Sequence, residues 1–140
     1  GRGRRVLLKD DQIMVPGAPE TAARRLVGHL KQLARADLAA ASDRYARALG
    51  KSYSRLTIRD TRSRWGSCSS SGGLMYSWRL ILAPPKVLSY VAAHEVAHLA
   101  EMNHSANFWQ LVEHLYGDYA PQRSWLRDNG HELHRFRFED

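Results

Sequence analysis

Residues 94–104 read HEVAHLAEMNH, and this stretch says the most about the function expected of the chain. His94 and His98 are four residues apart, so on a helix their side chains leave the same face one turn apart. That spacing lets two neutral imidazoles reach one Zn²⁺ at about 2.0–2.1 Å. Glu95 is rotated by about 100° from His94, where a carboxylate can act on a water molecule beside the metal without being a ligand. The segment therefore predicts a helix that carries a zinc site and a general base.

A catalytic zinc ion takes three protein ligands and keeps one position open, and His104 is the predicted third ligand. On an unbroken helix His104 would point about 100° away from the first two imidazoles. The helix is therefore expected to end near residues 102–103, where Asn103 tolerates the left-handed conformation that ends helices. The alternatives for the third ligand are Glu101, Glu113 and His114.

The competing interpretation of this segment is the charged outer face of a packed helix. It is disfavoured because the remaining residues are mostly apolar, so such a helix would bury Glu95 without a partner.

Composition predicts one globular domain in a reducing compartment. The chain has 140 residues and is 44% hydrophobic, which is enough for one core and too little for two domains. The lone Cys68 excludes an intrachain disulfide framework and favours the cytoplasm. No apolar run approaches the roughly 20 residues that span a bilayer, so we expect a soluble protein with no membrane partner.

The basic charge raises the question of a nucleic-acid or nucleotide partner. The net charge is +7, and 17 Arg stand against 4 Lys. Arg binds phosphate in a bidentate manner, so an Arg-rich surface is one interpretation. Solvated Arg side chains without a phosphate partner are the other, and composition favours it slightly.

Periodicity and turn signals give an order of elements. A hairpin is expected at about 6–15, as the remnant of a longer N-terminal region, and a long helix from Glu20 to about Leu49, ended by Gly50. The later elements are strands at 53–61 and 74–82 around a Ser/Gly loop, the motif helix from Pro84, a helix from Ser105 to about Leu115, and a short helix at 121–125.

Four blocks in and around the motif resemble the YgjP-like metallopeptidase family, which is related to the SprT-like zincins. The resemblance runs from about Arg62 to Trp125. The blocks are RWGSCSS at 64–70, WRLI at 78–81, HEVAHL at 94–99 and NHSANFW at 103–109. Ser77 departs from the family pattern, which has Asn there. A metzincin is excluded, because metzincins carry Gly where this chain has Glu101 and a Met-turn downstream, and no Met follows Met102.

The resemblance implies a zincin-like α+β fold, with a small antiparallel β-sheet packed on the active-site helix and flanked by further helices. It also implies that His94, His98 and His104 bind zinc, and that an extended peptide pairs with the strand expected at 74–82. Arg64 and Trp78, which belong to the family blocks, are the candidate residues of a substrate cleft, with a core position as the alternative for Trp78.

The function predicted from these observations is a zinc-dependent metallopeptidase-like hydrolase that acts on a peptide or protein. Three alternatives stay open. They are a SprT-like nucleic-acid-associated protease, a zinc-dependent nucleotide phosphohydrolase, and a basic nucleic-acid-binding module with a structural zinc ion.

Overall fold

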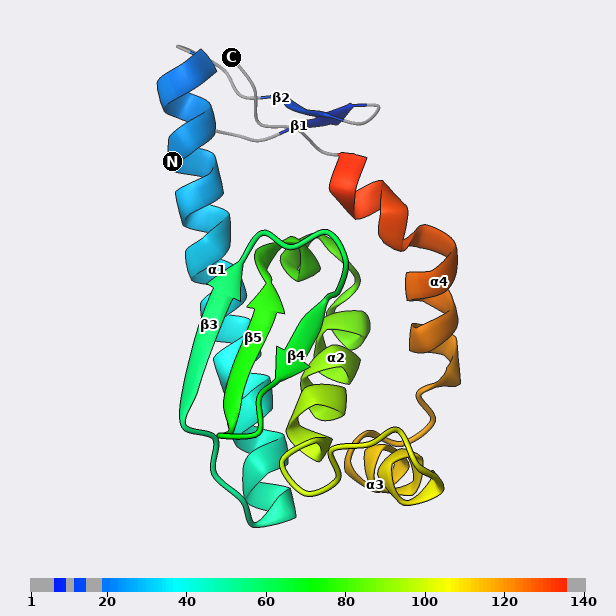
Figure 1. Cartoon of the computed structure of the whole chain (residues 1–140). Coiled ribbons are helices and arrows are strands. Elements are labelled where there is room, and N and C mark those ends of the chain that lie inside the picture. The colour runs from blue at the N-terminus through cyan, green and yellow to red at the C-terminus, as the bar shows by residue number, and fades with distance from the viewer. Residues whose placement is uncertain (1–6, 10–11, 15–18, 136–140) are drawn as a thin grey trace.

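Helix α2, Pro85–Ala97, carries His94, has His98 as its C-terminal cap and lies at the centre of the fold (Figure 1). The computed structural model describes residues 7–9, 12–14 and 19–135. Pro85 begins the helix, where its fixed φ suits the first turn. Most of α2 is buried, because α1, α3, α4 and the sheet all pack against it. A helix surrounded in this way is apolar on most sides, so its few polar residues mark the site.

Helix α1, Pro19–Leu49, lies beside α2 and forms the second long element of the core. Its buried stripe recurs at the spacing of a helix face and contains Ala34, Leu38, Ala41 and Tyr45. The helix ends as predicted, because Gly50 takes a φ of 75° that a residue with a side chain rarely adopts.

The sheet is mixed, whereas the sequence predicted an antiparallel one. Its strands are β3 (Arg55–Arg59), β4 (Gly66–Cys68) and β5 (Gly73–Ser77), in the spatial order β3-β5-β4. Strands β4 and β5 form an antiparallel hairpin, whereas β3 pairs with β5 in parallel. The chain leaves β3, crosses to the far edge as β4 and returns through the middle, so β5 runs in the direction of β3. The α+β class is confirmed, with the correction to the strand directions.

The strand expected at 74–82 is too long. Strand β5 ends at Ser77, and Trp78–Leu82 forms a 3-10 helix, η2. The Ser77 hydroxyl accepts a hydrogen bond from the Arg79 backbone N–H at 3.2 Å and so caps this helix. A local side-chain cap competes with strand pairing at the position where the chain departs from the family pattern.

Two further helices complete the described chain. Helix α3, Ala106–Tyr116, begins at the predicted cap, where the Ser105 hydroxyl accepts from the Phe108 N–H at 3.3 Å. Helix α4, Ala120–Arg135, is much longer than the expected segment at 121–125. It continues because it packs on the outer side of α2, where Leu133 is buried and its carbonyl accepts a 2.9 Å hydrogen bond from Arg79.

The expected N-terminal hairpin is present as β1 (Leu7–Lys9) and β2 (Gln12–Met14), which pair antiparallel. Its turn at 10–11 lies outside the described residues. Across the ranges that the structure describes, no helix has the length and apolar character needed to cross a bilayer.

Candidate metal centre

Helix α2 ends earlier than the sequence predicted, and this early end brings His104 back to the site. The helix stops at Ala97, with His98 as its cap, rather than near residues 102–103. Tight turns follow, in which His98 N–H donates to the Glu95 carbonyl at 3.1 Å and Leu99 N–H to the Val96 carbonyl at 2.9 Å. The loop after these turns reverses before Ser105 caps α3, and His104 lies in this loop.

The three predicted imidazoles converge. A ligand nitrogen from each of His94, His98 and His104 lies within 4.8 Å of the others. The Nε2 atoms of His98 and His104 are 3.2 Å apart. Two nitrogens bound at 2.0–2.1 Å to one tetrahedral zinc ion are separated by about 3.3 Å. The pair is therefore already spaced as two zinc ligands would be, and the donor set fits the metal.

In two of the three imidazoles, the Nδ1 atom has a hydrogen-bond partner in the protein. Nδ1 of His98 lies 2.9 Å from the backbone carbonyl of Glu101, which can only accept, so Nδ1 carries the proton and Nε2 is left with its lone pair. Nδ1 of His94 lies 3.3 Å from the hydroxyl of Tyr90. Partners of this kind orient metal-binding imidazoles and fix their tautomers.

The ring of Phe108 contacts all three imidazole rings. Its side chain is fully buried, with 0% exposed. It stacks on His98 with ring centroids 4.3 Å apart, and meets His94 and His104 edge to face at 4.9 Å and 5.0 Å. Trp109 covers His94 and His104 at 5.5 Å and 6.0 Å. Aromatic side chains on the helix after the third His thus fix the ligand geometry.

Glu95 lies beside this cluster in a space that strand β4 leaves for it. The side chain of Glu95 is 6% exposed. A Cβ atom at Gly66 would lie 2.9 Å from Cγ of Glu95, 3.1 Å from its Oε2 and 3.1 Å from the Met75 carbonyl oxygen. Only glycine lets β4 pass so close to the carboxyl group. Gly66 is the site residue that the sequence analysis missed; its place in the RWGSCSS block was the available signal.

Burial sets the charge state of the cluster. It lowers the pKa of His94 to about 3, with the positive charges of His98 and His104 adding to the effect. Burial also lowers the pKa of His98. His94 and His98 are therefore neutral at neutral pH, the state that binds metal. The pKa of Glu95 is raised to about 8 by burial, which the positive charge of Arg64 partly opposes.

A cavity of about 230 Å³ opens beside the three His and Glu95. Of the two cleft residues predicted from the sequence, one lines this cavity and the other does not. Arg64 lines it, as expected of a cleft residue. Trp78 does not, because its ring is buried in the core with 1% exposed, so its proposed place at the cleft is wrong. The residues that line the cavity are Arg64, Gly66, Ser67, Cys68, His94, Glu95, His98, Met102 and His104.

Other candidates for a role in the site lie outside this cavity. The side chains of Glu113 and His114 are exposed on α3, and Glu101 offers its backbone carbonyl to His98 rather than its carboxylate to the cluster. The hydroxyl of Tyr116 donates to the Lys86 carbonyl at 3.1 Å. Cys68 does line the cavity, but burial raises the pKa of its thiol, and the charge of Glu95 raises it further. Its Sγ is not one of the ligand atoms that lie within 4.8 Å of one another among the described residues.

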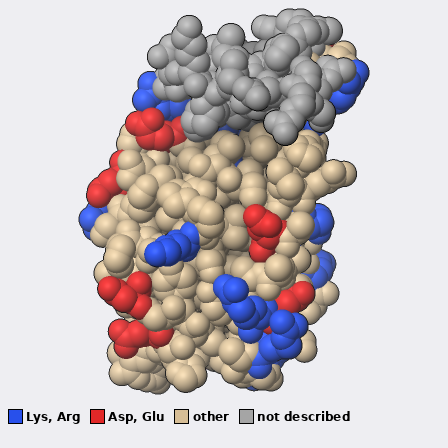
Figure 2. Space-filling model, turned by 180° about the vertical axis from the view of Figure 1, so that it is seen from behind, with Lys and Arg blue, Asp and Glu red and all other residues tan. Residues whose placement is uncertain are grey.

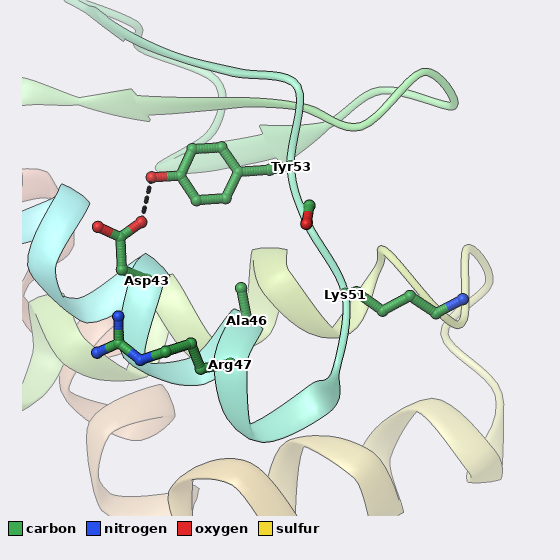
Figure 3. Close-up of a pocket in the computed structure, with 6 residues that line it drawn as sticks. Asp43, Ala46, Arg47, Lys51 and Tyr53 are labelled. Atoms are coloured by element: carbon green, nitrogen blue, oxygen red, sulfur yellow. Dashed lines mark hydrogen bonds between the residues drawn. The ribbon is translucent and has the colours of Figure 1, made fainter.

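A second cavity, of about 260 Å³, lies at the C-terminal end of α1 and carries no such chemistry. Figure 3 shows the hydroxyl of Tyr53 donating to the carboxylate of Asp43, while the Lys51 side chain points away from that pair. The Tyr53–Asp43 hydrogen bond accounts for the one carboxylate that lines it.

Comparisons with known proteins agree with this geometry. The profile of the family described as YgjP-like, metallopeptidase domain, matches residues 8–129. Among solved structures, the crystal structure of the metallopeptidase zymogen of Pyrococcus abyssi abylysin is similar, with a TM-score of 0.57 and 19% sequence identity. The match covers 67% of this chain and 93% of that one, and at this identity it shows a shared fold. Comparison with curated proteins gives no match.

Proposed function

The chain belongs to the YgjP-like metallopeptidase family, and on that premise we propose that it is a zinc-dependent peptidase. In this proposal His94, His98 and His104 hold the ion and Glu95 is the general base. The observation that carries the proposal is the convergence of three imidazole nitrogens within 4.8 Å beside a buried carboxyl group, in an open cavity. A site with three protein ligands keeps a position free for substrate, as a catalytic zinc site must.

The donor set favours zinc over calcium and magnesium. Neutral imidazoles suit zinc, whereas calcium and magnesium prefer oxygen ligands. A bound zinc ion would polarise the scissile carbonyl and lower the pKa of water at the site. Glu95 takes the proton of the attacking water and delivers it to the leaving amine. Burial raises the pKa of Glu95, which makes its carboxylate a stronger base towards that proton.

The substrate-binding strand in this proposal is β4, and the strand expected at 74–82 cannot serve. That strand is β5, which lies in the middle of the sheet with both edges paired. Trp65 and Ser69 hydrogen-bond to β5 through their backbone groups, at 2.9 Å each. In an antiparallel ladder, successive residues point their backbone N–H and C=O groups to opposite sides of the strand. The backbone groups of Gly66 and Cys68 therefore face away from β5, towards the outer edge of the sheet. Both residues line the cavity, which suits pairing with an extended peptide.

The alternative functions have less support. On the face turned away from the view of Figure 1, Lys and Arg are scattered among Asp and Glu and gather only near one lower edge, so this face carries no broad basic surface for nucleic acid (Figure 2). A phosphohydrolase would need several cations at the site, but Arg64 is the one Lys or Arg that lines the cavity. A structural zinc ion would need a fourth protein ligand, and the group found in the described part of the chain has three.

The test is to compare the zinc-loaded wild type with Glu95→Gln on an unfolded protein substrate. The substitution keeps the size of the side chain and removes the base, so we expect bound zinc to remain and turnover to fall by at least about 10²-fold. Glu113→Gln, on the exposed face of α3, is the matched control and should keep full activity. Undiminished turnover by Glu95→Gln would remove Glu95 from the mechanism.

A further inference from the structure

We propose that Arg64 binds the C-terminal carboxylate of the substrate, so that the enzyme removes one or two residues from the carboxyl end of a peptide. This proposal rests on the proposed peptidase function and names its substrate class. Four features of the structure carry it: the end of the free β4 edge, the direction of the strand that can pair there, the two-residue separation of Arg64 from Gly66, and the charge of Arg64.

The free edge of β4 stops at Arg64. By the alternation of the ladder, the next outward-facing carbonyl beyond Gly66 belongs to Arg64. That carbonyl already accepts one hydrogen bond, from the Thr61 hydroxyl at 2.8 Å. Trp65, between these two residues, is fixed against α4: its ring stacks on His134 at 4.7 Å, and a Cβ at Gly130 would be 3.2 Å from it. Strand β4 begins at Gly66, so a peptide that pairs with it leaves the regular ladder there.

The direction of the bound peptide follows from the topology of the sheet. Antiparallel pairing is the commoner and more stable arrangement for an added strand. A strand antiparallel to β4 runs in the direction of β5, towards the N-terminal end of β4. Arg64 lies two residues before Gly66, at that end. The carboxyl end of the substrate therefore approaches Arg64, and its amino end extends along the cavity past Cys68.

The two-residue separation of Gly66 and Arg64 limits the length of the leaving fragment. Glu95 lies against Gly66, so the scissile bond is placed beside Gly66. Two residues of antiparallel strand span about 7 Å, which is the reach of one or two substrate residues beyond that bond. A longer fragment would run into the turn of residues 61–64 and the Trp65–α4 contact.

The charge of Arg64 is free to meet a carboxylate. Its side chain is exposed in the cavity, and no ion pair of Arg64 occurs among the described residues. The other cationic side chain that this stretch contributes near the sheet, Arg62, is turned to the carbonyl of His134 at 3.5 Å. A guanidinium at the end of the β4 edge can bind both oxygens of a carboxylate.

The first arm of the test compares matched peptides that end in a free acid or an amide. We expect zinc-loaded wild type to release one or two C-terminal residues, identified by mass spectrometry, and to prefer the acid about tenfold in kcat/KM. Arg64→Ala should cleave the acid no better than the amide, with the loss mainly in KM, and Arg64→Lys should retain part of the preference. Arg59→Ala, on the opposite edge strand, is the matched control and should keep the preference.

The second arm measures binding without turnover. Zinc-loaded Glu95→Gln should bind the free acid about tenfold more tightly than the amide by calorimetry, and adding Arg64→Ala should abolish that difference. Equal binding of acid and amide, or cleavage of internal bonds at the same rate as C-terminal ones, would overturn the role of Arg64 and leave the peptidase function standing. Tighter binding of the acid, with no cleavage of any peptide by the zinc-loaded wild type, would support the role of Arg64 and count against the proposed peptidase function.

Discussion

Replacing Gly66 with alanine adds one methyl group at the place where β4 passes over Glu95. The new Cβ would lie 2.9 Å from Cγ of Glu95, whereas carbon atoms in contact sit at about 3.5–4.0 Å, so the overlap is at least about 0.6 Å. It would also lie 3.1 Å from the Met75 carbonyl oxygen, which belongs to a strand paired on both sides and cannot move away. The strain must therefore be relieved by displacing the Glu95 carboxyl group.

Such a displacement should reduce turnover far more than stability. Overpacking of this size costs about 1–3 kcal/mol of unfolding free energy, whereas a catalytic group misplaced by about 1 Å loses about 10²-fold in rate. We expect Gly66→Ala to fall by about 10²-fold in kcat while it still binds one zinc ion per chain.

The assay is steady-state hydrolysis, with zinc content and thermal unfolding measured on the same preparations. The matched control is Gly28→Ala in α1, where an added Cβ meets nothing within 4 Å; it should keep full activity and gain up to about 1 kcal/mol from helix propensity. If Gly66→Ala keeps wild-type kcat, the close approach of β4 does not position Glu95 and the reasoning is wrong.

Three further predictions test the supports of the site. Phe108→Leu should remain folded but lose about 10–100-fold in zinc affinity, measured by competition with a chelator, because three imidazole rings rest on this side chain. Asp60→Asn should cost about 1–2 kcal/mol in urea unfolding, because Asp60 accepts from the buried Arg79 at 2.9 Å but is itself partly exposed. Partial burial acts to raise the pKa of Asp60, yet the hydrogen bond and charge of Arg79 leave it below its usual value. The stabilisation by Asp60 is therefore present above about pH 4 and is lost as the pH falls through the pKa of the folded protein. If Asp60→Asn loses as much stability as the wild type between neutral and acid pH, this prediction is wrong. Ser42→Ala should cost about 1–2 kcal/mol, read as a lower Tm, because it removes the 2.9 Å hydrogen bond to the buried Tyr76 hydroxyl.

The sequence predicted the elements whose signals are local. The long α1 helix has an apolar stripe and a glycine stop, and α3 has a serine cap, so their bounds agree with the structure to within a residue or so. The grouping of the three His was also accessible, because the i, i+4 pair needs only helix geometry and the third His needs only a helix end before it.

What the sequence did not predict depends on contacts between distant segments. The parallel pairing of β3 with β5 results from where β4 crosses, which no local pattern records. Helix α4 has few apolar residues, and its length depends on the docking of Leu133 and Gly130 against η2 and Trp65. Gly66 looks like a loop glycine in sequence, because the carboxyl group that requires it lies 29 positions later, at residue 95.

The central claim is that three imidazoles hold one zinc ion and leave a position open beside Glu95. Anomalous diffraction at the zinc edge, on crystals of the zinc-loaded protein, tests it most directly. We expect one peak at about 2.0–2.1 Å from a nitrogen of each of His94, His98 and His104, with a ligand that is not protein in the fourth position. A peak elsewhere, or a fourth ligand from Cys68 or a carboxylate of the chain, would contradict it.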